Sequence, residues 1–305
     1  MIVKNFGRSA SYFGIVHTDK EYYVKTGNMR QIKIKEIKEI SLNGLIAFTT
    51  LCDQFQLQYY LAFGSLIGAV RHRGFIPWDD DIDLLMPRED YEKLRSLTTA
   101  FETEEWELFS YSTKQGFLMP YMKYCNRDTL VLPSRFNSGL VYGISIDIFP
   151  LDFFDGTSVR EVEEKIADMR NRIRVLERAA CKSAAYKRGI LRPLKYILKK
   201  ASFLLHPERV KRLIEEYKRL DAEMAKNSEK GGQFAAFVLS PYENIWFSSD
   251  FIGDGDQCSK LQFEERFFSA PYNPDAVLKK TYGDYMQLPS LPQRVSNHSF
   301  TAFEK

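Results

Sequence analysis

Residues Tyr60 to Met86, YLAFGSLIGAVRHRGFIPWDDDIDLLM, constrain the fold more than any other part of the chain. The aromatic and aliphatic run Tyr59–Phe63 is typical of a buried strand, and Gly64-Ser65 follows it without a linker. Glycine permits a tight turn, and Ser65 is a favourable N-cap for a helix over Leu66–His72. A strand that leads into a helix N-terminus presents free backbone N–H groups, so this turn is predicted to bind an anion.

A second strand is predicted over Asp81–Met86, and it carries the strongest chemical signal. Because side chains alternate across a strand, Asp81 and Asp83 share one face while the aliphatic residues between them enter a core. Asp79 lies two residues before Asp81, so its side chain would point to the same face as those of Asp81 and Asp83. Such close carboxylates repel one another unless a cation compensates, and Mg²⁺ prefers a few carboxylates with phosphate oxygens and water. A solvated acidic turn is the alternative, but the interleaved apolar residues favour a metal site.

The remaining elements are predicted from apolar periodicity and from Gly and Pro breaks. Helices are expected over Ile32–Phe55, Arg88–Leu97, Val159–Lys187, His206–Lys226 and Asp275–Tyr282; strands are expected over Trp106–Ser110, Tyr121–Cys125, Val141–Phe149, Phe234–Leu239 and Leu261–Phe263.

Two further charged residues are candidates for the site. Asp147 lies between two isoleucines of an apolar strand, so its carboxylate must be exposed, paired or metal-bound. We expect it to be the third carboxylate of the metal site. Lys123 lies between aromatic residues, where its amine either reaches a phosphate or extends to the surface as a solvated lysine. Asp152, just after Pro150, is predicted to be a turn or cap residue.

The composition excludes several classes of protein. The four cysteines are scattered and form no C-x-x-C pair, so neither a zinc site nor a disulfide framework is expected, and free thiols fit a reducing cytoplasm. No run of apolar residues is long enough to span a membrane, and the N-terminus does not resemble a signal peptide. We therefore expect a cytoplasmic protein.

Charge is distributed unevenly along the 305 residues. Residues 165–219 hold 17 basic and 5 acidic side chains, although the net charge of the whole chain is only +3. This block indicates a basic helical insertion that rests on an anionic membrane at the inner face of the cell, or else an ordinary solvated helical subdomain. Nucleic acid is not expected as a partner, because no recognition module accompanies the charge.

Together these segments resemble the LicD family, which includes the fukutin-related proteins. The resemblance rests on four stretches between about residues 40 and 298: Gly64–Tyr91, Gly143–Asp152 (GISIDIFPLD), Phe263–Pro271 (FEERFFSAP) and Thr281–Met286 (TYGDYM). It implies an α+β fold, a nucleotidyltransferase-like mixed sheet flanked by helices. The predicted organisation is a catalytic domain from residues 1–155 and 231–305, interrupted by the basic insertion at 156–230.

The resemblance also implies a reaction: transfer of a phospho-alcohol from a CDP-activated donor to a hydroxyl of a glycan or lipid-linked glycan, releasing CMP. CDP-choline is the expected donor, with CDP-ribitol and CDP-glycerol as alternatives, and teichoic acid or lipo-oligosaccharide is the expected acceptor. Transfer of NMP from an NTP would use the same turn and carboxylates, and a non-catalytic membrane scaffold is an alternative of another class. Some relatives hold a structural zinc, which the cysteine spacing here does not support.

The resemblance assigns roles to individual residues. Asp81, Asp83 and Asp147 would hold Mg²⁺, with Mn²⁺ as an alternative ion. Gly64 and Ser65 would form the phosphate-binding turn. Physical reasoning adds Arg71, Arg73 and Lys123 as phosphate contacts and makes Asp147 or Asp79 the acceptor of the attacking proton, with His72 as a weaker candidate base. The expected catalytic set is therefore Asp79, Asp81, Asp83 and Asp147.

Overall fold

The structure is a computed structural model that describes residues 12–17, 20–25, 29–114, 117, 119–133, 142–154, 164, 167–168, 171, 207–228, 232–236, 246–253, 257–295 and 300–305. Most of the predicted basic insertion at 156–230 lies outside these residues. The proposed division into residues 1–155, 156–230 and 231–305 therefore stays a prediction. In the described parts of the chain, no helix has the length and apolar character needed to cross a bilayer.

The centre of the fold is a seven-stranded mixed sheet built around the long strand β8. The order β10-β9-β8-β4-β3 is joined by β6, which pairs with β8, and by β5, which pairs with β6. The β4–β8 pair is parallel and the other pairs within this sheet are antiparallel. The strands are β3 (Tyr60–Leu61), β4 (Ile82–Pro87), β5 (Trp106–Phe109), β6 (Met122–Asn126), β8 (Ser145–Phe154), β9 (Phe234–Ala236) and β10 (Trp246–Ser248).

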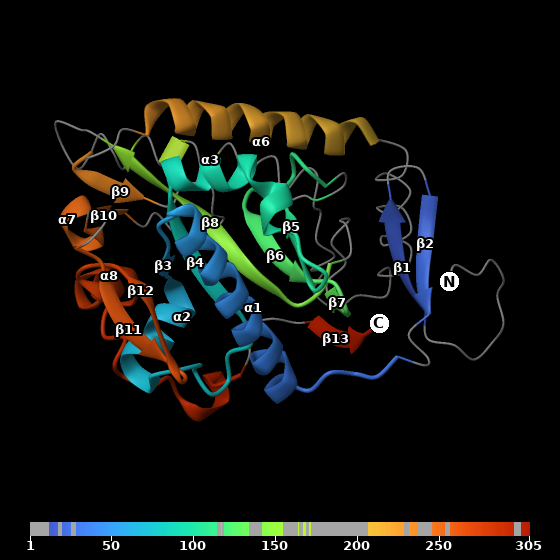
Figure 1. Cartoon of the computed structure of the whole chain (residues 1–305), viewed down its shortest axis with the longest axis horizontal. Helices are drawn as coiled ribbons and strands as arrows, with labels where there is room; N and C mark the ends of the chain where they lie inside the picture. The colour runs from blue at the N-terminus through green and yellow to red at the C-terminus, as the bar shows by residue number, and fades with distance from the viewer. Residues whose placement is uncertain are drawn as a thin grey trace, which may run out of the picture.

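Helix α1 (Ile34–Phe55) covers the apolar face of this sheet (Figure 1). Its buried residues recur at helical spacing, and Phe48 packs on Tyr124 of β6 with ring centroids 5.4 Å apart. Because side chains alternate along each strand, the apolar residues of β4, β6 and β8 that flank the charged ones belong to the core on the side of this helix, whereas Asp83, Lys123 and Asp147 face the other way. The sheet therefore has one core face and one chemical face.

The remaining elements surround the sheet. Helix α8 packs against α2, and α6 lies beside α3 along one side of the sheet (Figure 1). The helices are α2 (Phe63–Ile67), the π-helix η1 (Gly68–His72), α3 (Arg88–Ser96), the 3-10 helix η2 (Thr98–Phe101), α6 (Pro207–Asn227), α7 (Ser249–Ile252), α8 (Pro274–Tyr282) and the 3-10 helix η4 (Leu291–Gln293). Three two-stranded sheets join β1 (Tyr12–His17) to β2 (Lys20–Lys25), β7 (Thr129–Pro133) to β13 (Phe300–Glu304), and β11 (Ser259–Phe263) to β12 (Arg266–Ala270).

A buried ion network fixes α6 to the sheet. Arg88 at the start of α3 donates to both carboxylate oxygens of Asp152, at 2.6 and 3.0 Å, and to Asp221 of α6 at 2.6 Å. All three side chains are at most 4% exposed. Asp221 also accepts hydrogen bonds from Arg95 and Tyr111. The prediction of a turn role for Asp152 is wrong, because β8 continues past Pro150 and buries this carboxylate against an arginine.

The α+β prediction, with a mixed sheet flanked by helices, is confirmed, and the differences are local. The predicted strand Val141–Phe149 is displaced to Ser145–Phe154, and Tyr59–Phe63 shortens to Tyr60–Leu61 because α2 already begins at Phe63. The predicted helices over Ile32–Phe55 and Arg88–Leu97 are found as α1 and α3, within two residues at each end.

Candidate active site

Strand register assembles the first part of the site. In the parallel pair β4–β8, Asp83 lies opposite Asp147, and in the antiparallel pair β6–β8, Lys123 lies opposite the same Asp147. Residues opposite each other in a ladder point to the same face, so Asp83, Asp147 and Lys123 form one row across three strands. The register therefore brings residues 24 to 64 positions apart in the sequence to the same face of the sheet.

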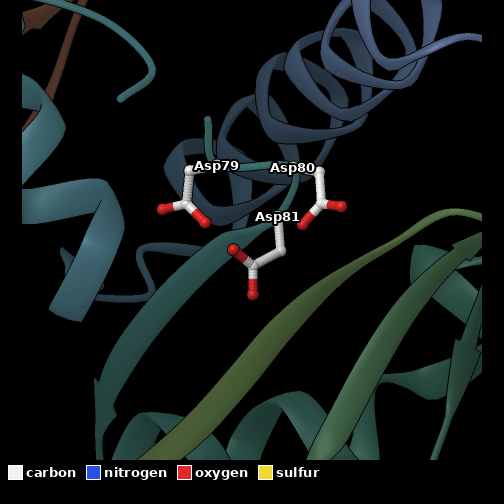
Figure 2. A group of neighbouring side chains, drawn as sticks. All are labelled: Asp79, Asp80 and Asp81. Atoms are coloured by element: carbon white, nitrogen blue, oxygen red, sulfur yellow. The ribbon is translucent and has the colours of Figure 1, made fainter. Parts of the chain in front are cut away.

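The loop before β4 supplies further carboxylates. Asp79, Asp80 and Asp81 each have a carboxylate oxygen within 4.8 Å of the other two, and all three side chains leave the loop towards one side (Figure 2). Asp80 was not predicted, because the phase argument treated residues 79–83 as a strand, whereas residues 79–81 form a loop that has no alternation. It is 8% exposed, the most buried of the three.

The Gly64-Ser65 turn is held against the acidic residues, but not in the predicted manner. Ser65 is not an N-cap: α2 begins at Phe63 after the N-cap Ala62, and the Ser65 hydroxyl accepts a hydrogen bond of 2.9 Å from the backbone N–H of Asp83. A Cβ on Gly64 would lie 2.5 Å from Oδ2 of Asp79. Gly64 therefore gives the Asp79 carboxylate space beside the start of the helix.

The electrostatics of the row are dominated by negative charge. Burial raises the pKa of Asp83 well above its ordinary value, and the neighbouring carboxylates of Asp81, Asp147 and Asp79 raise it further. Tyr282 at the end of α8 also lies close to these groups: although its side chain is 45% exposed, partial desolvation and then the charges of Asp83, Asp79 and Asp81 raise the pKa of its phenol. Tyr282 was not singled out from the sequence, although it lies in the Thr281–Met286 stretch.

Lys123 is not the solvated lysine of the alternative prediction. Its side chain is 8% exposed, and the ammonium pairs with the Asp147 carboxylate and lies 3.3 Å from the Ser145 hydroxyl. Burial lowers the pKa of Lys123, but the ion pair with Asp147 outweighs it and the pKa lies well above the ordinary value. The ammonium also lies 5.5 and 5.1 Å from the ring centroids of Tyr121 and Tyr142.

The two predicted arginines differ in their surroundings. Arg71 in η1 is half-buried, and its guanidinium donates to the backbone carbonyl of Tyr285 and to the His72 ring. Arg73 follows η1 with a left-handed φ of 57°, and it is exposed. Both arginines follow the short helix that begins beside the carboxylates, and their contact with phosphate stays a prediction.

Two residues that the sequence did not identify support the acidic loop. Lys38 of α1 donates to the carbonyls of Ile76 and Pro77, at 2.9 and 3.0 Å, just before the first aspartate. Glu264 in the β11–β12 hairpin accepts a 3.0 Å hydrogen bond from the backbone N–H of Phe75. Glu264 could have been identified from the sequence by its place in the FEERFF stretch. Lys38 could not, because it lies on a helix distant in sequence from the acidic loop.

The donor set suits a hard divalent cation. The converging oxygens belong to the carboxylates of Asp79, Asp80 and Asp81, and carboxylate oxygens are the ligands that Mg²⁺ and Mn²⁺ prefer. Of the predicted ligands, only Asp81 belongs to the group of converging carboxylates, together with Asp79 and Asp80. Asp83 and Asp147 lie opposite each other on β4 and β8 and are not part of that group. Which carboxylates bind an ion stays a prediction.

Comparison with known proteins gives three informative matches. Residues 56–172 match the family model described as LicD/FKTN/FKRP, nucleotidyltransferase domain. The lipopolysaccharide cholinephosphotransferase LicD of Haemophilus influenzae is 27% identical over 283 residues, which are 90% of this chain and 99% of that protein. An uncharacterized protein of Rickettsia prowazekii is 36% identical over 75 residues, covering 24% of this chain and 28% of that protein.

Proposed function

Because the chain belongs to the LicD family of nucleotidyltransferase-like phosphotransferases, we propose that it transfers phosphocholine from CDP-choline to a hydroxyl of a cell-surface glycan and releases CMP. The observation that carries this proposal is the placing of Asp83, Asp147 and Lys123 in one row beside the carboxylates of residues 79–81. The chemistry needs charge neutralisation and in-line positioning more than covalent help, and this arrangement of charges is suited to both.

The reaction breaks one bond and forms another at the same phosphorus. The acceptor hydroxyl attacks the phosphorus that carries the alcohol, the bond to CMP breaks, and CMP leaves with the electron pair. The hydroxyl proton passes to a carboxylate, for which Asp79 and Asp147 are the candidates. The ion pair with Lys123 already occupies the Asp147 carboxylate, which favours Asp79 as the acceptor of the proton.

The other residues bind and orient the donor. Mg²⁺ or Mn²⁺ held by Asp81, Asp83 and Asp147, or by Asp81 with its loop neighbours, would neutralise the donor pyrophosphate. The Gly64-Ser65 turn, Arg71 and Arg73 would contact the remaining phosphate oxygens. Ser65 has a second task, since its hydrogen bond to the Asp83 backbone keeps the helix start in register with β4.

The acceptor we propose is a lipid-linked or cell-surface glycan. The Haemophilus relative is named for lipopolysaccharide, and teichoic acid or lipo-oligosaccharide offers comparable hydroxyls. Work on a lipid-linked acceptor would place the protein at the inner face of the cell membrane, with the basic residues of 156–230 near anionic lipid.

The direct test follows the label from donor to acceptor. With CDP-choline labelled in the choline methyl groups, Mg²⁺ and a glycan acceptor, the label is expected to appear on the glycan with one CMP released per transfer. Free phosphocholine together with CMP, and no labelled glycan, would contradict the proposed transfer.

Nucleotidyl transfer is the second candidate, because the matching family model is described as a nucleotidyltransferase domain. An NTP labelled at the alpha phosphate separates the two reactions. Label on the acceptor from the NTP, with none from CDP-choline, would replace the phosphotransferase proposal by this alternative.

A further inference from the structure

Three aromatic rings continue the chemical face of the sheet beyond the charged row. Phe149 lies two residues after Asp147 on β8, and Tyr121 immediately precedes β6. Because alternate residues of a strand share a face, Phe149 lies on the side that carries the carboxylates, and the ring of Tyr121 packs against it there. Their centroids are 4.3 Å apart, and Phe63 meets Phe149 edge-on with centroids 5.6 Å apart.

The three rings differ in exposure in a way that suits a ligand. Phe149 is 6% exposed and serves as the base of the cluster, while Phe63 and Tyr121 are only half-buried. Phe63 also immediately precedes the Gly64-Ser65 turn, and it has a φ of 45°, a left-handed backbone that a bulky aromatic residue rarely adopts. Such strain persists where the surrounding structure enforces it, and it concentrates at ligand sites.

We propose that Phe63, Tyr121 and Phe149 form the subsite for the alcohol headgroup of the donor, and that this headgroup is a methylated ammonium such as choline. The inference rests on the proposed function, because it takes the neighbouring carboxylates as the place where the donor phosphates bind. The headgroup is a few bonds from the phosphorus, so it belongs next to the charged row and not at a distance from it.

The chemistry of the cluster selects a cation over a polyol. Ring faces attract quaternary ammonium groups, whereas ribitol and glycerol need hydrogen-bonding partners that the two phenylalanine rings cannot supply. The fold already places one ammonium against these residues, since Nζ of Lys123 lies 5.5 Å from the Tyr121 centroid. The charge of Lys123 is matched by the Asp147 carboxylate, so Lys123 does not exclude a second cation from the ring faces.

Donor selectivity tests the subsite. CMP release is measured with CDP-choline and with CDP-glycerol for the wild type, Phe63→Leu and Tyr121→Leu. Each leucine variant is expected to lose roughly tenfold in kcat/KM for CDP-choline while its rate with CDP-glycerol changes little, as the loss of one cation–π contact predicts. Tyr121→Phe keeps the ring and should keep the preference for CDP-choline. Phe267→Leu, which removes an exposed ring on β12, is the matched control.

Each outcome has a defined meaning. Equal losses with both donors would show that the rings only support the core, and a wild type that prefers CDP-glycerol would overturn the choline assignment; in both cases the phosphotransferase proposal stands. If the wild type releases CMP from neither donor, the proposed function fails. The subsite is then decided by tetramethylammonium alone, whose NMR shifts on titration must appear in the wild type and disappear in Tyr121→Leu. Absence of those shifts in the wild type overturns the subsite too.

Discussion

The Asp79 carboxylate lies where a side chain on residue 64 would have to be. A Cβ at that position would lie 2.5 Å from Oδ2 of Asp79, closer than any van der Waals contact. Glycine is therefore needed here for space, so that a carboxylate can lie against the first turn of a helix whose backbone N–H groups favour negative charge. At the residue scale the site depends on such contacts as much as on the charged groups.

Gly64→Ala is expected to displace Asp79 and reduce turnover by about 100-fold, because small displacements of catalytic groups have large effects on rate. The oxygen that the methyl would meet is the far end of a rotatable side chain, so the carboxylate can turn away and little unfolding free energy should be lost. The contact can be isolated in an Asp79→Ala background, where the added methyl has room. Gly64→Ala should then cause almost no further loss of turnover, and a full additional loss would contradict the contact.

His72 is expected to contribute to the loss of stability in acid. Burial, followed by the charges of Arg71 and Lys38, lowers the pKa of His72 below its ordinary value. As pH falls below about 6.5, the unfolded chain takes up this proton before the folded chain does, so stability decreases until the lowered pKa is passed. The drop in melting temperature between pH 7.5 and 5.5 should be smaller in His72→Gln. An equal drop in both proteins would contradict the assignment.

At the scale of elements, β8 connects the chemistry to the framework. Its first half carries Asp147 in the polar row, and its second half carries Asp152, which Arg88 joins to Asp221 of α6. Removing one member of a buried ion network leaves its partners charged and unpaired, which costs far more than the network itself contributes. The attachment of α6 therefore depends on Arg88.

Arg88→Met should lower the unfolding free energy by about 3–5 kcal/mol, because the buried Asp152 carboxylate loses both of its hydrogen bonds from Arg88 and Asp221 loses one of its donors. Arg30→Ala is the control. It removes two ion pairs, with Glu36 and Glu304, at an exposed position, so only a small change in the unfolding free energy is expected. Urea denaturation of both variants makes the comparison. Similar losses in the two variants would show that burial of the Arg88 network is not what makes it important.

The helices and strands could be predicted from the sequence more fully than the tertiary contacts that join them. Local periodicity located α1, α3 and β4, because each buries one regular face, and the alternation around Asp83 and Asp147 correctly placed both on a polar face. The role of Asp152 could not be predicted, because its partners lie 64 and 69 residues away in a register set by tertiary packing. Asp80 was missed because the alternation rule does not hold in a loop.

At the scale of the whole molecule, elements from three parts of the chain surround the site. Residues 60–87 supply the turn and the acidic loop, residues 122–154 supply Lys123 and Asp147, and the C-terminal residues supply Glu264 and Tyr282. A ligand that bridges these elements binds only the folded chain, so it should stabilise the whole molecule.

CDP-choline with Mg²⁺ is therefore expected to raise the melting temperature more than either component alone. A concentration one hundred times Kd corresponds to about 2.7 kcal/mol of added stability. CDP-ribitol, CDP-glycerol and CDP-ethanolamine, tested under the same conditions, should give smaller shifts. A larger shift with one of these donors would change the assigned alcohol, and no shift with any of them would contradict donor binding.

The most direct test of the account is the Mg²⁺ dependence of CMP release from CDP-choline in the wild type, in Asp83→Asn and in the surface control Asp250→Asn. We predict that the wild type and Asp250→Asn require the ion, and that Asp83→Asn loses at least about 100-fold in turnover while it remains folded. Full turnover by Asp83→Asn, or turnover by the wild type that persists in excess chelator, would contradict the central claim that this row of carboxylates is the catalytic site.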